Sequence, residues 1–350
     1  MEILQHIAAF DKHEQHVFFS ELFDRDLMPD LIICIAGADQ EQADAFLAIF
    51  TRHDRDKIIP DVEAARPVKK DLLNVSISRI QGILDSMPCL MEKHRKIRED
   101  AVQQTAINRD ILKEWLTREK PMSDQSLEKP WPPVQKSTAE NAAIIKLPEA
   151  EAKTLQKNDL FTIIRDRESR RKYTDEPLTL EELAFLLWST QGLKKVLADG
   201  RVTIRTVPSA GARHPFETYI AVNNVVGLRP GVYRYLFLEH ALELCFESSD
   251  LKRQLIICGV GQRFVGECAV CFFWSCIPYR TEWRYSIASH KIILLDAGHV
   301  CQNLYLACEA IGCGTCAVGS YHQEKTDAFL GLDGKEEFVI YLAPVGKVPR

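Results

Sequence analysis

The sequence predicts an α+β protein in which a sheet is packed by helices and preceded by a mostly helical N-terminal domain. Apolar residues recur at helical spacing through the first 118 residues. After residue 155, helical stretches alternate with short runs rich in β-branched and aromatic residues. A proline-rich segment, 119–138, separates the two regions. Two domains joined by an arm suit a chain of 350 residues.

Residues 1–118 are predicted to form a helical accessory domain. Its longest helix is expected from Lys70 to about Arg118, with apolar positions as far as Trp115, and Pro88 is expected to break or kink it. The run His53-Asp54-Arg55-Asp56 is too local to supply metal ligands from one face, and we interpret it as a solvated turn. We find no chemical motif here and expect the domain to bind a partner or a substrate.

Residues 119–150 are predicted to form a proline-rich arm that leads into the second domain, 151–350. Trp131 is expected to pack on that domain, because an exposed indole would be costly. The helix Lys291 to Ile311 is apolar on nearly all faces, which predicts burial in the middle of the fold. Strands are expected at 218–226, 231–235, 269–275 and 338–342.

Composition and charge exclude several classes of function. Hydrophobic residues make up 46% and charged residues 27%, which is usual for a soluble globular protein. The net charge of −5 gives no bulk attraction to nucleic acid or acidic lipid. The N-terminus lacks the pattern of a secretory signal, and the apolar run 31–36 is too short to span a bilayer. We therefore expect a cytoplasmic protein.

Eleven cysteines in such a chain are expected to be reduced thiols. The spacing of Cys308, Cys313 and Cys316 is similar to that of plant-type iron–sulfur ligands. A fourth ligand at suitable spacing is absent, so we interpret these cysteines as small apolar residues. No metal site is predicted.

Four arginines fall within seven residues at the start of the second domain, with Ser169 among them. Their planar guanidinium groups suit phosphate oxygens. A solvated basic turn is the alternative, and composition alone favours it. On a helix, Arg167 and Arg171 would share one face. The four are Arg165, Arg167, Arg170 and Arg171.

A capping box and two segments of small residues follow. Thr179 and Glu182 predict a capping box at the start of a helix. The run Pro208-Ser209-Ala210-Gly211 would let a planar ligand lie against the backbone, and a tight turn before a strand is the alternative. Gly312 and Gly314 end the long apolar helix and precede a predicted strand.

Three polar residues, Asp296, His299 and Asn303, are three and four positions apart and so line one stripe of the long apolar helix. Buried polar groups need hydrogen-bond partners. A hydrogen-bonded core network at a dimer interface is therefore favoured over a catalytic role.

Taken in order, these motifs resemble the nitroreductase-like flavoproteins, and most closely their SagB-type dehydrogenase branch, which includes the azoline oxidases of peptide natural-product clusters. The resemblance covers roughly residues 127–350, from the lead-in strand at 144–148 to the final Pro344-Val345-Gly346-Lys347. It implies a central mixed or antiparallel sheet packed by helices, and a homodimer with FMN between the subunits. The residues implied for FMN binding are Arg167, Ser169, Arg171, Pro208, Ser209, Ala210, Gly211, Asn303, Gly312, Gly314, Lys347 and Arg350.

The resemblance also points to an acid–base residue. The azoline oxidases carry a Lys-Tyr pair, implied as the general base, where this chain has Arg284-Tyr285. An arginine stays protonated and cannot replace the lysine as a base. Tyr285 is then the nearest match, if Arg280 or Arg284 stabilises its phenolate, and a packing role is the alternative. His214 and His299 are rivals because histidine titrates near neutrality. The catalytic candidates are Tyr285, Arg284 and His214.

By resemblance the chain is a two-electron oxidoreductase, in which a hydride moves between a substrate and flavin N5 and the flavin exchanges electrons with oxygen or NAD(P)H. No Gly-x-Gly-x-x-Gly follows a strand, so a Rossmann nicotinamide domain is not supported. One function is a SagB-type dehydrogenase acting on a modified peptide or small metabolite, and another is an NAD(P)H-dependent nitro- or ene-reductase. A flavin-free scaffold in a biosynthetic complex is the third. The long N-terminal addition favours the first, since small promiscuous nitroreductases need no such domain.

Overall fold

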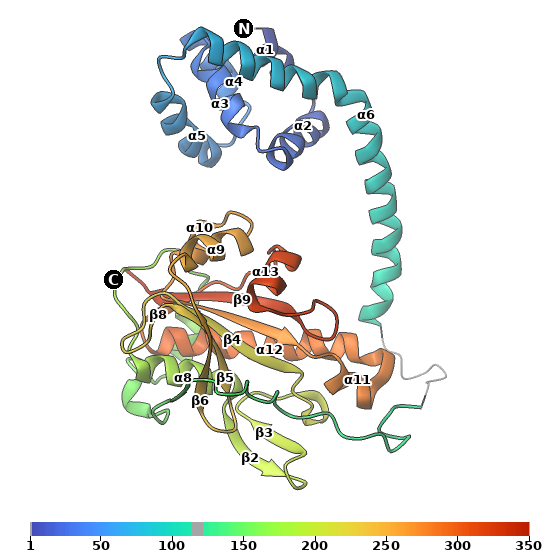
Figure 1. Cartoon of the computed structure of the whole chain (residues 1–350), viewed down its shortest axis with the longest axis vertical. Helices are drawn as coiled ribbons and strands as arrows, with labels where there is room; N and C mark the ends of the chain where they lie inside the picture. Colours follow the sequence, from blue (N-terminus) through green and yellow to red (C-terminus); the bar gives the residue numbers. More distant parts are fainter. Residues whose placement is uncertain (1, 114–121, 350) are drawn as a thin grey trace. The chain divides into compact units, whose positions relative to one another are not determined.

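The computed structural model describes residues 2–113 and 122–349, which form two compact units divided after Asp110 (Figure 1). The first unit is helical, as predicted, and the strands that the structure describes lie in the second. Within these residues, no helix is both long enough and apolar enough to cross a membrane.

Six helices build the first unit around a core of its own. Val17, Phe18 and Ile80 are completely buried there, as the helical spacing of apolar residues requires. The run 53–56 lies at the start of helix α5, which Thr51 caps, so the predicted solvated turn is helical instead. The helices are α1 (Glu2–Ala8), α2 (Lys12–Asp24), α3 (Met28–Ala36), α4 (Gln40–Leu47), α5 (Arg52–Ala64) and α6 (Lys70–Asn108).

Helix α6 continues through Pro88, so the predicted break is wrong. A proline removes one backbone hydrogen bond, and a helix of 39 residues has enough bonds on either side to remain continuous. Figure 1 shows α6 curving along its length without interruption. A 3₁₀ turn, Arg109–Leu112, follows it. The predicted positions Trp115 and Arg118 lie outside the described residues.

Seven strands of the second unit form one sheet in the order β1-β6-β5-β4-β7-β9-β8, in which every neighbouring pair is antiparallel. The four strands predicted from β-branched and aromatic content correspond to β4, β5, β7 and β9. The hairpin of β2 and β3 was not predicted. The strands are β1 (Ile144–Lys146), β2 (Leu193–Leu197), β3 (Val202–Arg205), β4 (Phe216–Val222), β5 (Gly231–Leu236), β6 (Ala241–Glu247), β7 (Val270–Cys276), β8 (Cys313–Thr315) and β9 (Phe338–Lys347).

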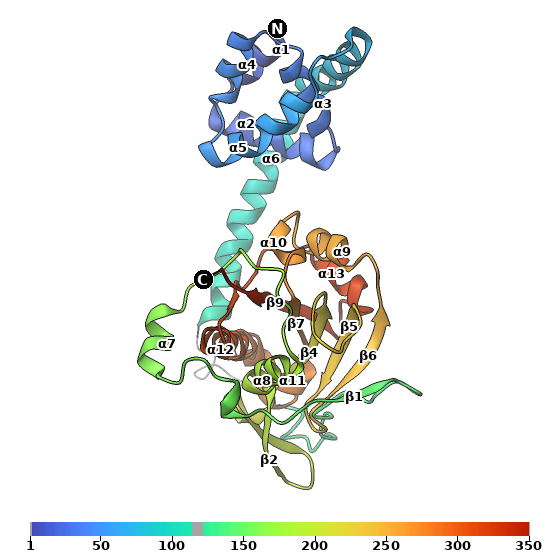
Figure 2. The ribbon, with the colours of Figure 1, turned by 90° about the vertical axis from the view of Figure 1, so that its left-hand side faces the viewer.

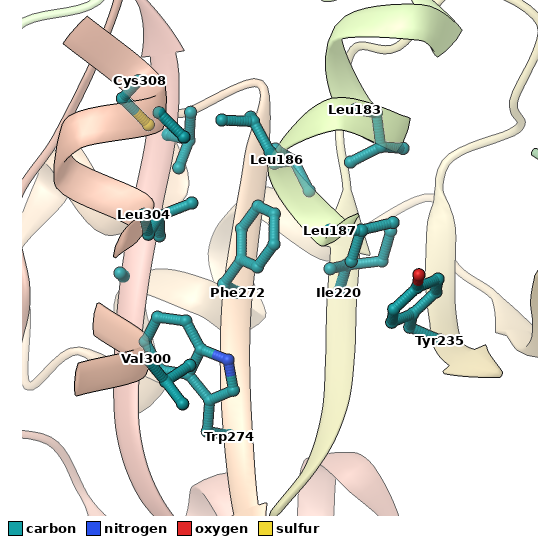
Figure 3. Close-up of a cluster of buried hydrophobic side chains, with 14 of the residues drawn as sticks. Leu183, Leu186, Leu187, Ile220, Tyr235, Phe272, Trp274, Val300, Leu304 and Cys308 are labelled. Atoms are coloured by element: carbon teal, nitrogen blue, oxygen red, sulfur yellow. The ribbon is translucent and has the colours of Figure 1, made fainter. Parts of the chain in front are cut away.

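Helices cover both faces of this sheet. Helices α8 (Leu180–Gln191) and α12 (Ser289–Ala310) lie side by side on one face (Figure 2), where Leu186 and Leu304 pack with Phe272 of β7 (Figure 3). Phe273, the next residue of β7, belongs to a separate core with α9 (Leu251–Cys258), α10 (Arg263–Gly266) and α13 (Gln323–Leu330). Successive side chains of a strand point to opposite faces, so both are buried.

The outer side of α12 is not covered within this chain. Its inner side contacts α8 and the sheet, but Leu294 and Leu295 are 52% and 56% exposed. The prediction that α12 is buried on nearly all faces is therefore wrong for the single chain. Leu294 lines a shallow cavity with Ile111 and Ile340, and more than half of its surface stays exposed.

The arm packs on the second unit, as expected for Trp131. The buried guanidinium of Arg205 donates to the backbone oxygen of Val134 at 3.1 Å, and that of Arg234 donates to Ser137 at 2.7 Å. The indole rings of Trp131 and Trp283 lie 4.5 Å apart. Two charged donors and one aromatic pair thus hold the extended arm against the unit.

Candidate functional site

The arginine segment begins where helix α7 (Leu160–Asp166) ends. Arg167 is the C-cap, and the chain then runs extended, with Ser169 bridging to Thr315 of β8. The expectation that Arg167 and Arg171 share one helical face is therefore wrong. The extended course is stabilised by backbone pairing with β8, where Arg170 N donates to Thr315 O at 2.9 Å.

Tyr305 of α12 anchors this segment. Its hydroxyl lies 2.9 Å from Ser169 Oγ and accepts from Ala317 N at 2.8 Å, while the Arg167 guanidinium lies 5.4 Å from its ring centroid. In the part of the chain that the structure describes, no carboxylate pairs with Arg167 or Arg171. Unpaired guanidinium groups beside a serine hydroxyl and backbone amides fit an anionic ligand such as a phosphate.

The run Pro208 to Gly211 lies beside the N-terminal half of α12. Ser209 Oγ donates to Asp296 Oδ2 at 2.5 Å and accepts from His214 N at 2.9 Å, and Ala210 N donates to Asp296 Oδ1 at 3.4 Å. Burial raises the pKa of Asp296, although the bonds from Ser209 and Ala210 oppose this shift. Asp296 thus holds the turn in place, and both of its carboxylate oxygens accept hydrogen bonds from the turn.

Gly211 brings the small-residue run against the predicted acid–base pair. Its φ is +57°, a conformation that glycine adopts without strain. A methyl group on Gly211 would lie 2.7 Å from Tyr285 Oη and 2.9 Å from Arg284 Nε, so only glycine lets these groups approach the backbone. Tyr285 ends helix α11 (Tyr279–Tyr285), and the Arg284 guanidinium lies 5.5 Å from its ring centroid. Two of the predicted site segments therefore meet here.

The rival histidines lie in different surroundings. His214 is 4% exposed, and burial, reinforced by the positive charge of Arg205, lowers its pKa to about 2. A neutral imidazole with so low a pKa is a poor proton acceptor. His299 is exposed on α12, whereas Asp296 is buried, so the predicted polar stripe does not form one buried network.

Several predicted cofactor residues lie away from Tyr285. Asn303 Nδ2 donates to Ser189 O at 2.9 Å and lines a cavity of about 410 Å³ bordered by α7, α8 and α12. Gly312, at φ +69°, lies against the side chain of Gln156. Gly314, in β8, lies against the side chain of Arg170 in the arginine segment.

Lys347 does not join the arginine segment in this structure. Lys347 is 7% exposed and its Nζ donates to Glu182, whose carboxylate also accepts from Thr179 N at 2.9 Å in the predicted capping box of α8. Its charge is therefore compensated within the fold. Arg350 lies outside the described residues.

All eleven cysteines are free thiols, and Cys308, Cys313 and Cys316 are buried. Burial raises the pKa of Cys308 well above its usual value and that of Cys313 to about 12. The Cys308 and Cys313 thiols therefore stay protonated and pack as small apolar side chains. Among the described residues, no three His, Cys, Asp or Glu side chains are grouped as they would be around a metal ion.

Arg213 and the two tryptophans were missed as site residues. The Arg213 guanidinium lies 4.9 Å from the Trp131 ring and 5.3 Å from the Trp283 ring, and its Nε donates to Gly211 O at 3.3 Å. A signal for Arg213 is present in the sequence, because this residue lies two positions after Gly211 of the small-residue run. The arm's approach to α11 is a tertiary contact that no local pattern encodes.

The family model described as "Nitroreductase family" matches residues 164–347. The chain belongs to the nitroreductase family. Members of this family are generally FMN-dependent oxidoreductases.

Two relatives and one solved structure illustrate the similarity. "Putative nitroreductase MJ1384" of Methanocaldococcus jannaschii is 30% identical over 203 residues, which cover 58% of this chain and 96% of that protein. The trifolitoxin-processing protein TfxB of Rhizobium leguminosarum bv. trifolii is 30% identical over 140 residues, 39% of this chain and 38% of TfxB. The crystal structure of a "putative nitroreductase" from Ralstonia eutropha is 24% identical, with a TM-score of 0.49. The match covers 63% of this chain and 99% of that one.

The residues of this nitroreductase-family chain fit FMN in two places. Unpaired guanidinium groups at Arg167 and Arg171 suit its phosphate, and the space left by the missing side chain of Gly211 suits a flat ring. The two places contact α12 at Tyr305 and Asp296, nine positions apart, which is about 14 Å along a helix. They do not form one cluster within a single chain.

Proposed function

We propose that this chain is an FMN-dependent oxidoreductase of the SagB type, acting on a modified peptide or a small metabolite. The observation that carries the proposal is the contact of Gly211 with Tyr285 and Arg284, which joins the proposed flavin-binding run to the proposed acid–base pair. The relationship to a protein described as trifolitoxin-processing supports a peptide substrate. FMN, when bound, accepts or donates a hydride at N5.

The chain's own residues supply positioning and proton transfer. Asp296 and Ser209 fix the turn that carries Gly211, through their 2.5 Å hydrogen bond. The Tyr285 hydroxyl handles the substrate proton, and the adjacent Arg284 guanidinium lies 5.5 Å from its ring centroid. His214 stays neutral and buried, so it has a packing role.

Replacing Arg167 and Arg171 together by alanine should abolish flavin binding while the fold persists. Both guanidinium groups lack a carboxylate partner among the described residues, so their removal leaves no buried charge unpaired. The measurement is the flavin absorbance of the purified variant, with circular dichroism as the check on folding. Arg165→Ala is the matched control, since Arg165 pairs with Asp166 at 2.8 Å and should retain flavin. Full flavin content in the double variant would rule out the phosphate role.

We also propose a homodimer with FMN between the subunits. Its support is the exposed apolar surface of two helices, formed by Leu294 and Leu295 of α12 and by Leu160, Phe161 and Ile164 of α7. Such a surface is typical of an interface. In a dimer, the arginine segment of one subunit and the Gly211 run of the other would together bind one FMN. Light scattering that finds a flavin-containing monomer would reject the dimer.

The helical first unit, proposed as 1–118, is assigned to binding a substrate or partner. Its core is separate from that of the second unit. Its removal should leave flavin bound and should slow turnover of a peptide substrate more than reduction of a generic dye. Loss of flavin on truncation would instead make the first unit part of the cofactor domain.

An NAD(P)H-dependent nitro- or ene-reductase is the second candidate. It is favoured by the description of the relative that this chain covers over 96% of its length. Rapid NADH- or NADPH-driven reduction of a nitroaromatic compound, without turnover of a thiazoline peptide, would select it.

A further inference from the structure

Arg213 is a buried cation that no carboxylate of the described residues compensates. It is 5% exposed, and its one hydrogen bond among the described residues runs from Nε to Gly211 O. Its terminal nitrogens have no hydrogen-bond acceptor there and are not among the fully buried polar atoms, so they remain open to a ligand. A largely buried guanidinium that lacks an anion favours a ligand that supplies one.

Arg284 brings a second positive charge to the same glycine. Its Nε lies 2.9 Å from the position of a methyl group on Gly211, and no carboxylate pairs with it among the described residues. The pKa of Arg213 is lowered, first by burial and then by the charge of Arg284. Arg284 is exposed, so water screens part of its repulsion with Arg213, and an anion bound between the two charges would relieve the rest.

Aromatic rings make this place selective. Trp131 of the arm and Trp283 of α11 are paired with each other, and their ring centroids lie 4.9 and 5.3 Å from the Arg213 guanidinium, both on the same side of it. The rings fix its orientation and leave its fork of donors for a planar, bidentate acceptor. The Tyr285 hydroxyl touches the same glycine, so an anion held here lies beside the proposed acid–base group.

We propose that Arg213 and Arg284 form a carboxylate-binding subsite next to Tyr285, so that the substrate carries a carboxylate within reach of its reacting carbon. This inference deepens the proposed function and rests on it, because the bound carboxylate belongs to a substrate only if the chain is an enzyme. The carboxylate belongs either to a peptide C-terminus or to an acidic side chain, and both present the same planar anion.

The test is a titration of the full-length protein with small probes, followed by tryptophan fluorescence because Trp131 and Trp283 lie beside Arg213. N-acetylglycine should give a saturable change, and its neutral analogue N-acetylglycinamide should not. N-acetylglutamic acid α-amide tests the side-chain source. Tighter binding of the first or third probe identifies the source.

Arg284→Gln should weaken binding of the preferred probe at least about tenfold, as loss of a charge-assisted hydrogen bond requires, and Arg284→Lys should restore part of it. Arg201→Gln is the matched control, because Arg201 also lies over Trp131, at 5.6 Å, and bonds only within its own hairpin. It should change binding less than twofold.

Equal binding of the neutral amide, or no effect of Arg284→Gln, would overturn the subsite. Loss of flavin from Arg284→Gln would also overturn it, by assigning the pair to the cofactor. Flavin absorbance of each sample separates this failure from that of the proposed function. A yellow protein that ignores carboxylates rejects the subsite alone, whereas a colourless wild type rejects the proposed function and leaves the titration readable.

Discussion

Tyr285→Phe should slow substrate-dependent flavin reduction at least about 100-fold, because a positioned acid–base group contributes about 10²–10⁴ in rate. The substitution removes the hydroxyl that lies against Gly211 and keeps the ring beside Arg284. Flavin content should therefore be unchanged. The measurement is anaerobic bleaching of the flavin by a thiazoline-containing peptide.

Tyr279→Phe is the matched control for this prediction. Tyr279 lies on the same helix, but its hydroxyl donates to Asp124 of the arm at 2.7 Å and touches none of the site residues. Its removal should alter the rate by less than about threefold. Wild-type bleaching in Tyr285→Phe would mean that Tyr285 only packs.

Lys347→Met should destabilise the second unit by about 3–5 kcal/mol, the usual cost of removing one partner of a buried ion pair. Glu182 is 9% exposed and would be left as a buried carboxylate without its cation. Burial is the largest single effect and lowers the pKa of Lys347, but the hydrogen bond to Glu182 and the nearby negative charges together raise it. The ammonium therefore stays charged at neutral pH, and methionine cannot replace it.

Tryptophan fluorescence during urea unfolding measures this loss, since the tryptophans of the described residues, at 131, 188, 274 and 283, all lie in the second unit. Lys347→Met combined with Glu182→Gln should recover most of the lost stability, because the amide is neutral and still accepts from Thr179 N. If Lys347→Met alone unfolds at the wild-type urea concentration, the pair does not stabilise the fold. Lys347 would then be free to bind a phosphate, as its sequence motif implied.

Local patterns predicted the fold where local chemistry determines it. Their β-branched and aromatic content located β4 and β7, and Thr179 with Glu182 located the start of α8. Helical spacing failed for Arg167 and Arg171, because pairing of Ser169 with β8 keeps that segment extended. A contact between residues nearly 150 positions apart leaves no trace in local spacing.

The site was predicted in part for the same reason. The small-residue run and Tyr285 were identified by motif, and the structure brings them into contact through Gly211. Arg213 was not named as a site residue, because its burial and its contact with Trp131 and Trp283 arise from tertiary packing. Lys347 was assigned to phosphate because its partner, Glu182, lies 165 positions away.

The visible absorbance of the purified full-length protein tests the central claim most directly. The claim that the chain binds FMN predicts a yellow protein with flavin bands and about one FMN per chain, released on denaturation. A colourless protein that also fails to bind added FMN would contradict it and would leave a flavin-free scaffold as the function.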